Sequence, residues 1–197
     1  MFTPFDYQMH FQHLKKSIFE ANQLEKSDIV KISLTVSLPQ AGWMASTLQI
    51  GYDSYNFDFS DTYPPFQKIK KWIENIIDDQ DSEPVMIDDE HNEHFFYTTK
   101  TTNPDRLIFE YLRFTYPGTG VYRKALIGKQ QLVETFYLVF EYLMSIDFEK
   151  EEQIREGGIE YPLTWFHLDP NSDDIIRFDL SKMTDYLKIN NKTVQDK

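Results

Sequence analysis

The stretch that decides the fold spans residues 30–51 and reads VKISLTVSLPQAGWMASTLQIG. Across residues 30–38, apolar side chains occupy every second position and alternate with Lys, Ser and Thr. Strict alternation predicts a β-strand with one buried and one solvated face. The Pro, Gln, Ala and Gly at 39–42 are typical of a turn, so residues 43–51 are predicted to return as a second, antiparallel strand.

Working outward from this hairpin, the same two periodicities predict the other elements. Tyr55, Phe57 and Phe59 alternate with polar residues and predict a third strand. Four further strands are predicted over residues 85–87, 95–100, 107–114 and 121–127. Apolar residues spaced three and four apart predict helices over 3–24, after Pro65, and over 130–144. Residues 149–158 are predicted as a charged loop, and 161–168 and 175–178 are candidates for short strands.

Strands in a run, with helices before, within and after them, indicate an α+β protein. We expect an antiparallel sheet of about five to seven strands with two or three helices packed mainly on one face. No linker rich in Ser, Gly or Pro divides the chain. We therefore predict a single domain over 1–187 and a frayed polar tail over 188–197.

Composition excludes several classes of protein. The 197 residues include 16 Phe, 12 Tyr and 3 Trp, an aromatic share that disordered chains lack. The absence of cysteine excludes disulfides, thiolate nucleophiles and Cys-ligated zinc. No apolar run approaches the roughly 20 residues of a membrane span, and the first residues do not resemble a signal peptide. We therefore predict a cytoplasmic protein without a membrane partner.

The charge is acidic and unevenly distributed. There are 32 Asp and Glu against 20 Lys and Arg, which gives a net charge of −12. Residues 51–94 hold 12 acidic and 3 basic residues, and residues 146–179 hold 10 and 3. Such blocks repel nucleic acid, so we predict no nucleic-acid partner, and they speed the encounter with a basic protein. The simpler explanation is solubility.

The candidate partner-binding residues are the carboxylates of the first block that lie close together in the sequence. We expect them to steer a basic protein electrostatically, while an aromatic side chain supplies affinity. They are Asp78, Asp79, Asp81, Glu83, Asp88, Asp89, Glu90 and Glu93.

The run from Asp88 to His94 also supports an alternative, a metal-dependent hydrolase using His91 and His94 with Asp88 or Asp89. A polar hairpin between two strands is the simpler interpretation, because neighbouring side chains there would not converge. We therefore predict neither a metal site nor a cofactor. No GxSxG, SxxK or glycine-rich phosphate motif is present, so no catalytic residues are assigned and a non-enzymatic role is favoured. A third possibility is a small-ligand binder with an apolar pocket between helices and sheet.

A resemblance to known proteins rests on Gly42-Trp43, Ile50-Gly51, Pro65-Phe66 and the run Lys71-Trp72-Ile73-Glu74. With these residues the chain resembles small acidic α+β domains of bacteria, some of which look like immunity proteins of toxin systems. The resemblance spans about residues 30–145 and implies a binding role. It carries no catalytic residues. Together with the charge, it predicts an immunity-like inhibitor of a basic partner.

Overall fold

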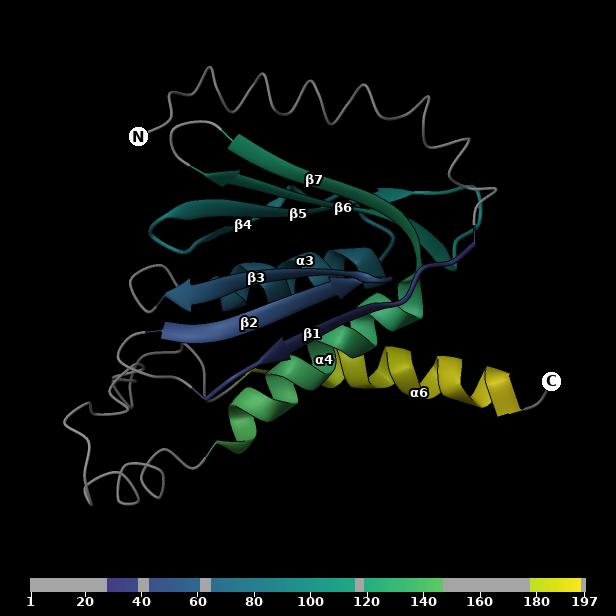
Figure 1. Cartoon of the computed structure of the whole chain (residues 1–197). Helices are drawn as coiled ribbons and strands as arrows, with labels where there is room; N and C mark the ends of the chain where they lie inside the picture. The colour runs from purple at the N-terminus through teal and green to yellow at the C-terminus, as the bar shows by residue number, and fades with distance from the viewer. Residues whose placement is uncertain (1–27, 39–42, 61–64, 116–118, 147–177, 196–197) are drawn as a thin grey trace.

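The computed structural model describes residues 28–38, 43–60, 65–115, 119–146 and 178–195, and Figure 1 draws the remainder as a grey trace. The helix predicted over 3–24, the loop over 149–158 and the short strands over 161–168 and 175–178 lie outside these residues, apart from Phe178. The described elements are seven strands and three helices.

The first sheet is the predicted meander. Strand β1 (Ile32–Val36) pairs with β2 (Trp43–Ile50), and β2 pairs with β3 (Asp53–Ser60), all antiparallel. The alternation at 30–38 is confirmed, because Ile32 and Leu34 are buried while Lys31 and Thr35 are exposed. Gly51 connects β2 to β3 with a φ of 63°, a left-handed conformation that glycine adopts at little cost.

A helix then separates the first sheet from the second. Helix α3 (Phe66–Ile77) is followed by β4 (Val85–Asp88), β5 (Asn92–Lys100), β6 (Arg106–Thr115) and β7 (Thr119–Gly128), which pair in sequence order and antiparallel. Helix α4 (Lys129–Ser145) follows directly, and α6 (Ser181–Gln195) completes the described chain. The α+β class with antiparallel sheets is thereby confirmed.

The seven strands form two sheets, where we expected one. Helix α3 carries the chain away after β3, so β4 starts a new sheet instead of extending the first. The two sheets meet through aromatic side chains of β3 that pack on β5 and β6. The rings of Tyr55 and Tyr111 lie 4.6 Å apart, and those of Phe57 and His94 lie 5.0 Å apart. At the other side, the backbone N–H of Val30 donates to the carbonyl of Leu126 at 2.8 Å.

The helices and both sheets share one apolar core. Trp72 of α3 is 2% exposed and contacts the rings of Phe96, Phe109 and Phe136, which come from β5, β6 and α4. Trp72 thus joins helix α3 to both β5–β6 and α4 in the core. In Figure 1, α4 and α6 lie side by side below β1, and the hydroxyl of Thr135 on α4 donates to the carbonyl of Ile32.

Helix α6 differs from the predicted tail. Its residues Met183 and Leu187 are buried in the common core, and the helix continues to Gln195. We expected fraying from Lys188. Apolar packing against α3 and α4 holds the part of the helix that precedes Lys188.

Candidate functional site

The most acidic part of the described chain lies where α3 ends. Residues 72–99 contain nine acidic side chains (Glu74 in addition to the eight candidates) and no Lys or Arg. Strand β4 divides these candidates into two groups. Asp78, Asp79, Asp81 and Glu83 precede it, and Asp88, Asp89, Glu90 and Glu93 surround the hairpin that follows it.

Helix α3 ends in a compact reversal that places the first group at the surface. The N–H of Gln80 donates to the carbonyl of Asn75 at 2.8 Å, and the N–H of Asp79 donates to that of Ile76 at 3.2 Å. This is the hydrogen-bond pattern of a Schellman motif, in which the residue after the cap adopts a left-handed conformation. Asp79 fills that position with a φ of 53°, where glycine is the usual residue. The reversal directs the next residues back toward β5.

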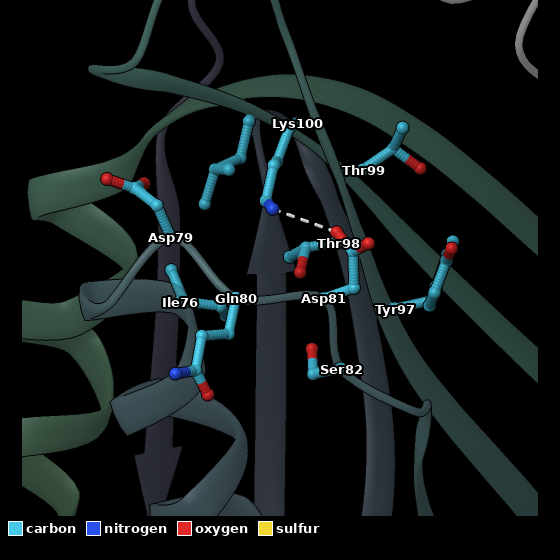
Figure 2. A pocket seen from close by; sticks show the side chains of 10 residues that line it. Ile76, Asp79, Gln80, Asp81, Ser82, Tyr97, Thr98, Thr99 and Lys100 are labelled. Atoms are coloured by element: carbon cyan, nitrogen blue, oxygen red, sulfur yellow. Dashed lines mark ion pairs between the residues drawn. The ribbon is translucent and has the colours of Figure 1, made fainter.

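A pocket of about 220 Å³ lies between this reversal and strand β5. Figure 2 shows side chains of the reversal on one side and those of β5 on the other. Burial raises the pKa of the Tyr97 phenol above its ordinary value, and the charges of Glu110, Asp81 and Glu83 act in the same direction. The charged residues of the lining are two aspartates, Asp79 and Asp81, and one lysine, Lys100. The lining residues of the pocket are Ile76, Asp79, Gln80, Asp81, Ser82, Tyr97, Thr98, Thr99, Lys100 and Leu107.

One lysine of this chain already occupies the rim. Nζ of Lys100 lies 2.9 Å from Oδ1 of Asp81, the ion pair drawn as a dashed line in Figure 2. The two side chains are 47% and 97% exposed. Ion pairs that are this exposed contribute about 0–1 kcal/mol, because water and salt screen them. The carboxylate of Asp81 is therefore held loosely.

The other two aspartates of the group are bound more firmly. Nζ of Lys129, on α4, lies 2.6 Å from Oδ1 of Asp79 and 3.3 Å from the carbonyl of Ile77, and 5.7 Å from the ring centre of Tyr186. The Lys129 side chain is only 6% exposed. Lys182 of α6 forms an ion pair with Asp78. These contacts fix the end of α3 to both neighbouring helices.

The second group forms a closed turn between β4 and β5. Asp89 is 8% exposed, and its Oδ1 accepts from the backbone N–H groups of His91 and Asn92 at 3.1 and 2.5 Å. Its Oδ2 lies 2.9 Å from Nε2 of His94. Burial alone would raise the pKa of Asp89, but the hydrogen bonds from His94 and Asn92 outweigh it and lower that pKa to about 2. Asp89 is thus a structural acceptor with little surface for a partner.

The other acidic residues of this turn also make internal contacts. Asp88 accepts from the backbone N–H of Glu90 at 2.8 Å, and Glu90 has a φ of 64°. Oε1 of Glu90 accepts from the hydroxyl of Ser60 at 2.8 Å, which connects the turn to β3. Glu93 follows on β5, opposite Asp88. The turn therefore presents carboxylates whose positions are set by the hairpin itself.

The two histidines of the metal hypothesis are not brought together as ligands. His94 lies on β5 instead of in the predicted loop, and it is fully buried. Its Nε2 faces Asp89, and its Nδ1 lies 2.9 Å from the hydroxyl of Tyr111, so both ring nitrogens have partners. His91 is exposed. In the part of the chain that the structure describes, no three His, Asp or Glu side chains are arranged to hold a metal ion.

Sequence reasoning identified the carboxylates but missed the cations that face them. Lys100, Lys129 and Lys182 lie outside both acidic blocks, and no local motif marks them. Asp89 did carry a signal, because an Asp that precedes Asn92 by three residues between two strands is typical of a side-chain-capped turn.

Comparisons with known proteins return no match: no family model fits the chain, and no curated protein or solved structure is significantly similar to it. Among the described helices, none is long and apolar enough to cross a bilayer.

Proposed function

We propose that the chain is a non-enzymatic protein-binding module that inhibits a basic partner, in the manner of an immunity protein. The observation that carries this proposal is the Asp81–Lys100 pair beside the pocket. A carboxylate that is 97% exposed stands at the rim of a pocket and is paired with a lysine that is itself half exposed. A basic side chain of a partner would form the same ion pair with Asp81 and occupy the adjacent pocket.

The proposed mechanism has two steps. The carboxylates around the pocket and the β4–β5 turn attract a basic surface over long range, which speeds the encounter. A lysine or arginine of the partner then enters the pocket and replaces Lys100 at Asp81. Replacement costs little, since an exposed ion pair contributes about 0–1 kcal/mol. The new pair is shielded from water by the partner, where charge-assisted hydrogen bonds are stronger.

The residues assigned to direct contact are those that the fold leaves accessible. They are Asp81 at the pocket, Glu83 two residues further along the chain, and Glu90 at the turn as a steering charge. Asp78 and Asp79 contribute to the negative field while remaining paired with Lys182 and Lys129. Asp89 is excluded from contact because it is buried, and it supports the turn instead.

The first experiment is capture of the partner with charge variants. The tagged chain is incubated with lysate of its own host in low and in high salt, and bound proteins are identified by mass spectrometry. We expect one basic protein in near-equal amount, lost at high salt, because exposed charges are screened beyond about 8 Å at physiological ionic strength.

A matched pair of double variants tests the site itself. Asp81→Asn with Glu83→Gln removes the exposed charge that lines the pocket and a second exposed charge close to it in the chain, and Asp28→Asn with Glu134→Gln removes two exposed charges elsewhere. Loss of the captured protein with the first pair and retention with the second supports the proposal. Equal loss with both pairs would mean that binding of the captured protein depends on the net charge of the chain and not on the pocket. Retention with both would remove the pocket from the mechanism.

A further inference from the structure

The inner face of the second sheet changes character along its strands. Near the end that holds Leu107 and Ile127 it is apolar, and it contributes to the common core. Toward the other end, the residues on the same face are His94, Tyr111, Arg113 and Arg123. The register shows that they share this face, because Arg113 is opposite His94 and Tyr111 is opposite Arg123.

The two arginines are diagonal neighbours on adjacent strands, a relation that places side chains within mutual reach. The Nε atom of each is buried and makes no hydrogen bond. Nε of Arg123 lies 3.1 Å from Oδ2 of Asp53, which gives an ion pair without hydrogen-bond geometry. Among the described residues, no carboxylate forms an ion pair with Arg113. A buried N–H donor is normally hydrogen-bonded, so both Nε–H groups keep the capacity to donate to a further acceptor.

The titratable groups near this pair include Asp53, Asp89 and His94, and Asp58 lies close to the last two. Asp53 is 49% exposed and is the acidic partner of Arg123. Asp89 lies near Tyr111 but accepts hydrogen bonds from His94 and Asn92. The charge of Arg113 opposes the effect of burial on the pKa of the Tyr111 phenol, which places the guanidinium close to that ring. Because the chain has 12 more acidic than basic residues, most arginines would be expected to have a carboxylate partner, and Arg113 has none among the described residues.

We infer that Arg113 and Arg123 form a binding site for an oxyanion, a phosphate or carboxylate group of a small ligand. Each guanidinium offers Nε and an adjacent Nη as two parallel donors, which match two oxygens of such a group. Tyr55, whose ring lies 4.6 Å from that of Tyr111, supplies a phenol at the same place, and the charge of Arg123 opposes the rise that burial and Asp53 cause in its pKa. This site is distinct from the acidic pocket and is independent of the proposed function, because its ligand has the opposite charge.

The experiment observes the two Nε–H groups directly. Buried N–H protons exchange slowly with water, so the side-chain Nε resonances of Arg113 and Arg123 are followed by ¹H–¹⁵N NMR. Inorganic phosphate, phenyl phosphate and succinate are added separately at constant ionic strength, with chloride as the reference anion. We expect saturable shifts of both resonances. Saturation with the phosphates alone or with succinate alone identifies the oxyanion class.

Three variants separate binding from folding. Arg113→Gln is expected to weaken binding about tenfold or more, since hydrogen bonds to charged groups are the strong ones. Arg106→Gln, on the same strand but on the opposite face by register, should bind as the unaltered chain does. Asp53→Asn removes the competing carboxylate and should bind more tightly, a gain that damage to the fold cannot produce. Shifts that are linear in anion concentration, or equal losses in Arg113→Gln and Arg106→Gln, would overturn the inference.

Discussion

Nζ of Lys129 lies 2.6 Å from Oδ1 of Asp79, a residue 50 positions earlier in the chain. This pair joins the first turn of α4 to the reversal that ends α3. The lysine is almost fully buried, whereas the aspartate side chain is 65% exposed. Removing Asp79 would leave a buried ammonium without its carboxylate, whereas removing Lys129 would leave a carboxylate that water can solvate.

The first prediction follows from that asymmetry. Asp79→Asn keeps a residue that tolerates a left-handed conformation but leaves the buried Lys129 ammonium without an opposite charge, with the carbonyl of Ile77 and the ring of Tyr186 still beside it. We expect it to lower the free energy of unfolding by about 1.5–3 kcal/mol. Lys129→Met should cost less, because it also removes the buried charge. Urea denaturation of both variants checks the order, and a larger loss in Lys129→Met would contradict this account.

The second prediction concerns acid stability. The pKa of Asp89 is about 2 in the folded chain, below its ordinary value of 3.8. The folded state therefore favours the carboxylate, and the stability it contributes is present above about pH 4 and lost as the pH falls toward 2. Asp89→Asn should lack this part of the pH dependence. The free energy of unfolding measured from pH 7 down to pH 2 tests it. Asp81→Asn, at a freely exposed carboxyl group, is the control that should retain the slope.

The third prediction concerns the buried chain of hydrogen bonds from Asp89 through His94 to Tyr111. Because Asp89 is ionised, His94 donates from Nε2 to its carboxylate, and Nδ1 of His94 lies 2.9 Å from the Tyr111 hydroxyl. Tyr111→Phe should cost about 1–3 kcal/mol by leaving that nitrogen unsatisfied. In a double-mutant cycle with His94→Leu, the two losses should not add, with a coupling of at least about 0.5 kcal/mol. Additive losses would show that the hydrogen bond contributes nothing.

The fourth prediction concerns alkaline stability. Burial raises the pKa of Tyr186 to about 12, and Asp105 and Asp79 act in the same direction. The folded chain holds this proton more tightly than the unfolded chain, so the associated stability is complete below pH 10 and declines between about pH 10 and 12. Tyr186→Phe should show a shallower decline over that range. Ultraviolet difference titration should show one fewer late-ionising phenol in the variant.

The fifth prediction tests the role of Lys100 in the proposed function. If Lys100 occupies the place of a partner's basic side chain, Lys100→Ala should bind the captured basic protein more tightly and with a steeper salt dependence. Lys31→Ala, at an exposed lysine on the approach to β1, should change the affinity less. Weaker binding by Lys100→Ala would place this lysine among the contacts that hold the partner instead.

The sequence was a good guide to the strands and a partial guide to the site. The periodicities placed β3, β5, β6 and β7 within a few residues of their observed bounds. The two acidic side chains that line the pocket, Asp79 and Asp81, belong to the acidic block that the sequence shows. Their separate fates were not predictable, since Asp81 is exposed and Asp89 is buried although both lie in the same acid-rich stretch. Whether a carboxylate in a turn is buried or exposed depends on the hydrogen bonds that it accepts.

By itself, the sequence determined which residues form strands and helices and which face of each is apolar. Those properties depend on spacing along the chain, and alternation such as that around Ile32 and Leu34 permits only one buried face. The tertiary structure alone decided that the strands divide into two sheets, that Lys129 meets Asp79, and that Arg113 and Arg123 share a face. The first two depend on contacts between residues distant in sequence, and the third depends on the pairing register of β6 and β7, which no local pattern records.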